Sequence, residues 1–212
     1  MFIRGTRVQT PPEKVDDAIA NFKKQVMPSV SKAPGYVGAG LMIDRKSGAG
    51  IGITYWESAK ALSNSEQVGI KTRTNAVQNV SGTQIVNVER YEIVIMERNA
   101  PPKADTFVRV NELNADLDKV EALIAFSKSK VLPTLKTIKG FRSLVVGVDR
   151  GTGRCAISTS WDTLADLQAS ESKVAGLRQE AVKTAGADGV EIEIFEVPVI
   201  ELMPAAVGAA TR

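Results

Sequence analysis

The chain has 212 residues, of which 43% are hydrophobic and 24% are charged, and this composition excludes a disordered polymer, a collagen-like repeat and a small disulfide-stapled protein. Its 27 basic and 24 acidic side chains leave a net charge of +3, which is too small to indicate a nucleic-acid or anionic-membrane partner. One cysteine allows no internal disulfide, and the absence of histidine excludes zinc hydrolysis through histidine ligands, Ser-His-Asp acyl transfer and histidine-ligated haem.

The first strand and helix are predicted near the N-terminus. Residues 2–8 are predicted to form a short strand, and Thr10-Pro11-Pro12-Glu13 has the form of a helix capping box with proline in the first turn. Apolar residues then recur at steps of three and four, which predicts an amphipathic helix that ends before Pro34.

A hairpin follows this helix. Residues 37–43 and 51–55 alternate with a period of two and are joined through Lys46-Ser47-Gly48, as expected for two antiparallel strands. A more polar helix at about 58–80 and a strand at about 85–96 complete the order β-α-β-β-α-β.

The second half of the chain repeats the first. An offset of 105 residues aligns matching residues over most of both halves, and near the end the offset becomes 104, which indicates two homologous copies. We therefore predict a first unit at 1–98, a Pro-rich linker at 99–105, a second unit at 106–202 and a flexible tail at 203–212. The aligned residues include Phe2/Phe107, Arg4/Arg109, Pro28/Pro133, Trp56/Trp161, Ser65-Glu66/Ser170-Glu171, Arg73/Arg178 and Tyr91/Phe195.

This duplication predicts an α+β fold in which each unit is ferredoxin-like. Helices on one face leave the other face of each antiparallel sheet to be covered, so we expect the two sheets to pack face to face as an intrachain pseudo-dimeric α+β barrel with a lumen. The protein is then expected to be a monomer with an internal pseudo-dimer, or a homodimer of it. Without a signal-peptide or membrane-span pattern in the sequence, we expect a cytoplasmic protein and no membrane partner.

The candidate site residues come from strand alternation. If the branched residues of the strands pack under the helices, then the opposite parity faces the lumen. The branched set is Ile3, Val37, Leu41, Ile43, Ile51 and Ile53. The candidates are Arg4, Arg109 and Asn111 as catalytic residues, and Phe2, Trp56, Tyr91, Phe107 and Trp161 as ligand-binding residues.

Two interpretations stay open for these candidates. Arg4 or Arg109 binds a phenolate or carboxylate, or each pairs with a local carboxylate such as Glu89, Glu193 or Glu196. The tryptophans stack on an aromatic ligand, or they are core residues. Cys155 is expected to be a small buried hydrophobe. No nucleotide-binding glycine motif and no metal-ligand cluster occur, so no cofactor and no metal are predicted.

Local motifs resemble the antibiotic biosynthesis monooxygenase (ABM) family. Pro34-Gly35-Tyr36, Asp44-Arg45, Gly48 and Tyr55-Trp56-Glu57-Ser58 form the pattern in the first copy. In the second copy it is repeated as Lys139-Gly140-Phe141, Asp149-Arg150, Gly153 and Ser160-Trp161-Asp162-Thr163. The resemblance implies a dimeric α+β barrel and, in some members, cofactor-free oxygenation of polycyclic phenols to quinones.

The resemblance also extends to a haem-degrading branch, whose members have an asparagine four residues after the opening phenylalanine. Asn111 matches this position and Thr6 takes its place in the first copy, but the histidine that holds haem iron is absent from this chain. We therefore expect a protein that binds a small aromatic molecule in the lumen, either as a cofactor-independent monooxygenase or as a ligand carrier or scaffold without catalysis.

Overall fold

The computed structural model describes residues 1–203, so the predicted tail lies outside the described residues except for Met203. The strands are β1 (Phe2–Gln9), β2 (Tyr36–Ile43), β3 (Ala49–Trp56), β4 (Gln84–Arg98), β5 (Thr106–Asn114), β6 (Phe141–Val148), β7 (Arg154–Trp161) and β8 (Glu191–Leu202). The α-helices are α1 (Val15–Asn21), α2 (Met27–Val30), α3 (Ala59–Asn64), α4 (Glu66–Asn79), α5 (Val120–Phe126), α6 (Leu132–Lys136), α7 (Leu164–Ala169) and α8 (Glu171–Ala185).

The element order confirms the predicted α+β class with two ferredoxin-like halves. The hydrogen-bonded strand order is β1-β3-β2-β8-β5-β7-β6-β4, and it closes as in a barrel. The hairpin pairs β2-β3 and β6-β7 are antiparallel, as are the pairs β1-β3 and β5-β7 that flank them.

The chain contacts define two compact units that interleave in the sequence. Among the described residues, unit 1 contains Met1–Arg90, Pro102–Asp105 and 195–203, and unit 2 contains Tyr91–Pro101 and Thr106–Ile194. The second part of β8 accordingly pairs with β2 inside unit 1, and the second part of β4 pairs with β6 inside unit 2. The long strands β4 and β8 are therefore each divided between the two units.

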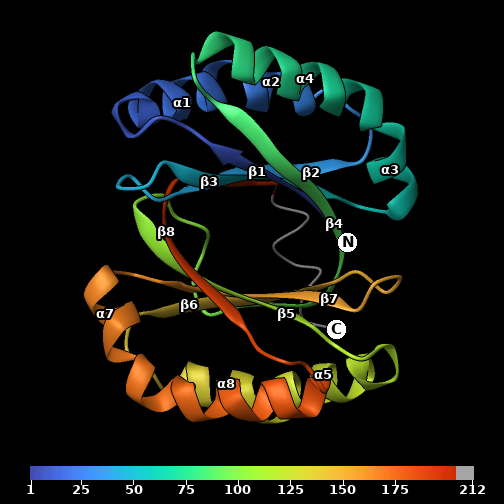
Figure 1. Ribbon diagram of the computed structural model, residues 1–212, viewed down its shortest axis with the longest axis vertical. Coiled ribbons are helices and arrows are strands. Elements are labelled where there is room, and N and C mark those ends of the chain that lie inside the picture. The colour runs from blue at the N-terminus through green and yellow to red at the C-terminus, as the bar shows by residue number, and fades with distance from the viewer. Residues whose placement is uncertain (204–212) are drawn as a thin grey trace. The chain divides into compact units, whose positions relative to one another are not determined.

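In unit 1 the helices cover one face of the sheet, as Figure 1 shows for α1, α2 and α4 above β1, β3 and β2. Residues Val15, Ile19 and Phe22 of the first helical segment are buried against Ala39, Leu41, Ile43 and Val199 of the sheet. The apolar face predicted from the helix sequence is buried at this interface. Burial stabilises the fold by about 25 cal/mol for each Å² of apolar surface removed from water.

The helical segment between β1 and β2 contains a π-turn. The turn η2 (Phe22–Val26) joins α1 to α2 just before Pro28, where a proline lacks the N–H for a helical bond and crowds the preceding turn. Unit 2 has the same π-turn, η4 (Ser127–Val131), before Pro133. The sequence predicted the helix, but not the widening of its backbone.

The predicted capping box at Thr10 was wrong. A 3₁₀ turn, η1 (Pro12–Lys14), opens the helical segment without any side-chain cap, as η3 (Leu117–Lys119) does in unit 2. The Thr10 side chain is fully buried, and its hydroxyl lies 3.3 Å from that of Thr83. Burial of Thr10 beside the start of β4 therefore removes its hydroxyl from the helix end.

The core of unit 2 is larger and more continuous than that of unit 1. One cluster of buried apolar residues joins its helices to its sheet and includes Leu123, Leu135, Leu144, Ile157 and Trp161. Leu123 and Leu144 have no exposed surface. The helix–sheet layer of unit 2 is thus filled by one continuous set of apolar side chains.

Candidate ligand pocket

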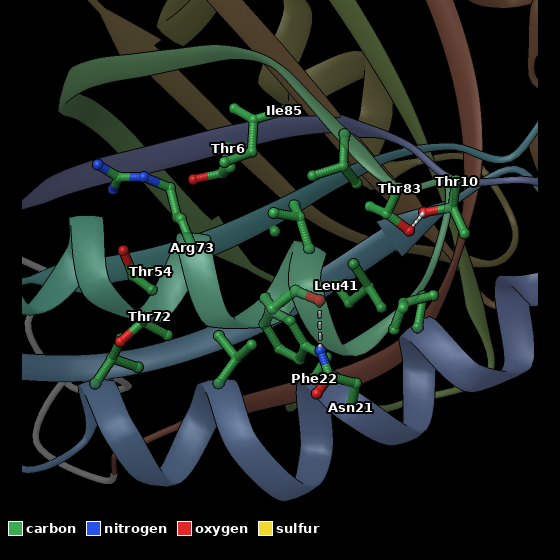
Figure 2. Close-up of a pocket in the computed structure, with 18 of the residues that line it drawn as sticks. Thr6, Thr10, Asn21, Phe22, Leu41, Thr54, Thr72, Arg73, Thr83 and Ile85 are labelled. Atoms are coloured by element: carbon green, nitrogen blue, oxygen red, sulfur yellow. Dashed lines mark hydrogen bonds between the residues drawn. The ribbon is translucent and has the colours of Figure 1, made fainter.

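A pocket of about 100 Å³ lies in unit 1 between the sheet and its helices. Its volume is several times the roughly 10–15 Å³ that one water molecule needs. Figure 2 shows its wall, with Leu41 and Thr54 from the strands and Phe22 and Thr72 from the helical segments. Most of the lining is apolar, and the polar side chains among the lining residues are Arg4, Thr6, Thr10, Asn21, Thr54, Thr72, Arg73 and Thr83.

Strand register places these residues on the helix-covered face. Arg4 pairs with Thr54, and Thr6 pairs with Gly52, which in turn pairs with Leu41 of β2. Residues directly opposite each other in an antiparallel pair point to the same side of the sheet. Leu41 packs with Phe22 of the helical layer, so Arg4 and Thr6 point toward the helices as well.

The predicted lumen-facing parity was therefore wrong for β1 and β3. Ile51 pairs with Arg7 and with Met42, so it lies on the face opposite to Leu41 and Ile43. The prediction grouped all branched residues on one face, although both faces of this sheet carry buried apolar side chains. Arg109 and Asn111 are misplaced in the same way, because they line a pocket in unit 2 with Val131 and Leu135 of its helical layer.

Arg4 is buried at the polar end of the unit 1 pocket, with 3% of its surface exposed. Its Nη2 atom donates hydrogen bonds to Leu62 O at 2.8 Å, Ser65 Oγ at 3.0 Å and Glu66 Oε2 at 2.9 Å. Its Nε atom is the one buried side-chain nitrogen or oxygen in residues 1–203 without a hydrogen-bond partner. The ion-pair interpretation is thus correct for Arg4, but its partner is Glu66 and none of the three carboxylates expected.

Glu66 holds three guanidinium groups at once. Besides Arg4, Arg73 Nη2 lies 2.9 Å from Oε1 and Arg90 Nη2 lies 2.8 Å from Oε2. Burial acts to raise the pKa of the Glu66 carboxyl, but hydrogen bonds from Arg90 and Arg73 and the charge on Arg4 outweigh it and lower that pKa to about 2. Glu66 is therefore ionised at neutral pH and is not a general base.

Two of these arginines converge across a glycine of α4. A Cβ atom on Gly69 would lie 2.8 Å from Arg4 Nη1 and 2.9 Å from Arg73 Nη1. Burial lowers the pKa of Arg4 below its ordinary value while Glu66 opposes this, yet an arginine in a protein keeps its proton. The polar end of the pocket thus carries more positive than negative charge.

Unit 2 has a matching but more balanced cluster. Arg178 makes two hydrogen bonds of 2.8 Å to the Glu171 carboxylate, and Arg109 Nη2 lies 3.0 Å from Glu171 Oε2. Arg178 Nε also donates to Asn111 Oδ1 at 2.9 Å. No third arginine bonds to Glu171 within the part of the chain that the structure describes.

The pocket of unit 2 is about 50 Å³, half the volume of its counterpart. Five lining residues of unit 1 align with larger side chains in unit 2, although Phe22 and Val80 align with smaller ones. At three of the five positions glycine or alanine is replaced by a branched residue. The five exchanges are Ala18/Leu123, Gly52/Ile157, Gly69/Val174, Val30/Leu135 and Thr72/Leu177.

The aromatic side chains predicted to bind a ligand lie outside the lining of the two pockets. Trp56 is fully buried with Ala61 and Leu62, and Phe2 packs against the same cluster. Trp56 Nε1 donates to Thr54 Oγ1 at 3.0 Å, and Arg4 Cζ lies 5.6 Å from the Trp56 ring centroid. Trp56 therefore supports the position of Arg4 through a cation–π contact.

The aromatic candidates of unit 2 are also core residues. Trp161 is fully buried in its main cluster, and its ring makes an edge contact with Phe141 at 5.7 Å between centroids. Phe107 packs against the same cluster. Tyr91 is buried in β4 where a Cβ on Gly147 would touch it at 2.9 Å. Their predicted contact with a ligand stays a prediction.

The candidates selected from the sequence did not include the α4 residues near the polar end of the pocket, namely Arg73 and Gly69 with their neighbour Glu66. The internal alignment pairs Arg73 with Arg178 and Glu66 with Glu171, so the signal was a charged pair retained in both copies seven residues apart. Two turns of helix place such residues on one face. Their contact with a strand residue was not visible from local sequence.

Other side-chain chemistry is sparse in the described part of the chain. Cys155 is buried, and burial raises the pKa of its thiol to about 11. Residues 1–203 contain no group of three or more acidic or cysteine side chains arranged to hold a metal. None of the helices in this range combines the length and the apolar character needed to span a membrane.

Comparison with known sequences gives a family match and an uncharacterized relative. Residues 1–68 match the family model described as Antibiotic biosynthesis monooxygenase, ABM. The uncharacterized protein Rv2557 of Mycobacterium tuberculosis is 29% identical over 202 residues, which cover 95% of this chain and 89% of that protein.

Comparison with solved structures extends the fold over both units. A putative monooxygenase from Fusobacterium nucleatum superposes with a TM-score of 0.71 at 13% identity, covering 95% of this chain and 94% of that one. An anthrone oxidase-like protein gives a TM-score of 0.68 at 17% identity, covering 99% and 96%. Residues 1–68 are therefore similar in sequence to the ABM family, and both halves of the chain share the fold of these two solved proteins.

Proposed function

We propose that the pocket of unit 1 binds a small aromatic phenol and promotes its oxygenation by dioxygen without a cofactor. The observation that carries the proposal is the charge imbalance beside the pocket. The lining residues Arg4 and Arg73 share the single carboxylate of Glu66, which also pairs with the half-exposed Arg90 outside the lining. A phenolate oxygen would balance this charge, and the apolar wall suits an aromatic ring.

The residues of the pocket would act mainly on the protonation state of the substrate. A guanidinium beside a phenol favours the phenolate, which is the electron-rich form that reacts with dioxygen. The apolar side chains Val26, Leu41 and Ile43 would exclude water from the ring. The lining residues in unit 1 include no carboxylate, lysine, cysteine or tyrosine, so the phenolic proton would pass to solvent.

The reaction balances without an added reductant. A ring methylene of a polycyclic phenol gives up two hydrogens, one oxygen atom of dioxygen becomes the new carbonyl oxygen, and the other leaves as water. The substrate supplies the electrons that reduce dioxygen. The protein contributes charge stabilisation and position, which are the two effects that a pocket without a cofactor can provide.

Oxygen uptake with 1,8-dihydroxyanthrone as the probe tests this proposal. Wild-type protein is expected to accelerate uptake above the buffer rate, with formation of the quinone, and Arg73→Met is expected to remove most of the acceleration. Arg178→Met, the matched change in unit 2, should retain it. Equal rates with and without the protein would overturn the catalytic proposal.

The absence of a base among the lining residues favours a second candidate, a carrier that binds the phenol without turning it over. Binding and catalysis are separated by titrating the same probe under nitrogen. Saturable binding under nitrogen, together with an oxygen-uptake rate no higher than that of buffer, would identify the carrier. A failure of binding would exclude both functions for this probe.

A further inference from the structure

One side-chain contact of unit 2 has no equivalent in unit 1. Asn111 Oδ1 accepts a hydrogen bond of 2.9 Å from Arg178 Nε, and Asn111 Nδ2 donates to Ile157 O at 3.3 Å. Asn111 is 9% exposed and lines the pocket of its unit. Its amide oxygen therefore satisfies the Arg178 donor that faces the pocket.

Unit 1 has the same arginine with a different neighbour. Thr6 stands at the strand position of Asn111, since Thr6 pairs with Gly52 and Asn111 pairs with the aligned Ile157. Arg73, aligned with Arg178, is bonded to Glu66 through Nη2, and its Nε donates to no residue within 1–203. The threonine side chain is shorter and brings no amide oxygen to this place.

The residues around Arg73 suit a hydrogen-bond acceptor from a ligand. Thr6, Arg73 and Arg4 all line the unit 1 pocket, and the buried Nε of Arg4 has no hydrogen-bond partner. Figure 2 shows Thr6 and Arg73 on the same side of the pocket. Gly69 leaves the space between the two guanidinium groups free of a side chain. At the aligned position of unit 2 stands Val174.

We infer that the side-chain oxygen of Asn111 takes the place of a ligand oxygen at Arg178 and so blocks the site in unit 2. In unit 1 the matching ligand oxygen would bind at Arg73 Nε. The ligand class is then a carboxylate or phenolate whose oxygen accepts from Arg73, with its ring directed to the apolar wall. This inference rests on the proposed function for the ring, but the oxygen subsite can be tested alone.

Acetate is the probe for the oxygen subsite, read by the arginine Nε–H signals in nitrogen-15 NMR spectra. We expect acetate to shift the Arg73 Nε–H signal saturably and to leave the Arg178 Nε–H signal in place, because Asn111 already occupies that donor. Signals are assigned with Arg73→Lys and Arg178→Lys. Absence of an acetate shift at Arg73, or equal shifts at both arginines, would overturn the inference.

Exchange of the two strand residues provides the second measurement. Thr6→Asn should weaken acetate binding at Arg73 by roughly tenfold or more, because a hydrogen bond to a charged donor is worth about that factor, and it should slow solvent exchange of the Arg73 Nε–H. Thr6→Val has no amide oxygen, so it should weaken acetate binding less than Thr6→Asn does and should not slow the exchange of the Arg73 Nε–H. Asn111→Thr should make the Arg178 signal respond to acetate.

The aromatic part of the proposal has a separate readout. 2-Naphthoate carries the same carboxylate on a two-ring system, and naphthalene is the control without an acceptor oxygen. If acetate shifts Arg73 but 2-naphthoate does not bind, the oxygen subsite stands and the proposed aromatic ligand fails. If 2-naphthoate binds wild type and Thr6→Asn equally well, the substitute role of Asn111 is contradicted while the pocket remains.

Discussion

Glu66 Oε2 lies 2.9 Å from Arg4 Nη2, an ion pair that ties the first strand to the start of α4. The Arg4 side chain is 3% exposed to solvent, whereas the Glu66 side chain is 28% exposed. The pair is the point at which the two layers of unit 1 meet at the polar end of the pocket. Its charge pattern is the basis for the predictions on stability and on ligand binding.

Glu66→Gln should lower the free energy of unfolding by about 1–3 kcal/mol, because it weakens charge-assisted hydrogen bonds to three arginines and leaves buried positive charge uncompensated. Urea denaturation of the variant and of wild type measures the difference. Glu13→Gln is the control, since Glu13 is an exposed residue of the η1 turn. A loss as small as that of the control would show that Glu66 does not hold the two layers together.

Acid should destabilise unit 1 in a defined range of pH. The Glu66 pKa is lowered from 4.5 to about 2 in the folded protein, so its contribution to stability is present above pH 4.5 and is lost as the pH falls toward 2. Thermal unfolding midpoints at pH 6 and pH 3 should therefore differ less in Glu66→Gln than in wild type. An identical pH dependence in both proteins would contradict the assigned pKa.

Gly69→Val should reduce binding of 2-naphthoate about tenfold or more, because its Cβ would come within 3 Å of Arg4 Nη1 and Arg73 Nη1 and move the guanidinium groups from the pocket. Isothermal titration calorimetry measures the affinity. Gly176→Val in α8 is the matched control, since a Cβ at Gly176 has no neighbour within 4 Å. Unchanged affinity in Gly69→Val would place the ligand away from the two arginines.

Cys155 should be unreactive in the folded protein. Burial raises the pKa of its thiol to about 11, and the thiolate is the form that attacks disulfide reagents. Ellman's reagent at pH 8 should therefore react with the native protein much more slowly than with protein unfolded in guanidinium chloride. Rapid modification of the native protein would mean that the β7 strand opens readily.

The fold was predictable because its signals are local and repeated. Short stretches of chain show the apolar period of the first helix and the hairpin through Gly48. The alignment of the two copies shows each of these signals twice. At Gly48 the backbone has a φ of 75°, and a Cβ would lie 1.8 Å from Thr10 O. Glycine is therefore required at this turn, and the turn marks the hairpin in the sequence.

The site was less predictable because it depends on register and on distant contacts. Arg4 and Arg109 stood out in the sequence as charged residues in apolar strands, but the face of β1 follows from its pairing with β3, which no local pattern reports. Both faces of the sheet bury branched residues, so alternation alone does not distinguish them. The contact between Arg4 and Glu66 joins residues 62 positions apart, and only the packed structure shows it.

The most direct test of the account is calorimetric titration of 2-naphthoate into wild type, Arg73→Met and Arg178→Met. We expect one site per chain, a loss of affinity of roughly tenfold or more in Arg73→Met, and wild-type affinity in Arg178→Met. No binding to wild type, or an equal loss in both variants, would contradict the central claim that the pocket of unit 1 binds an aromatic anion at Arg73.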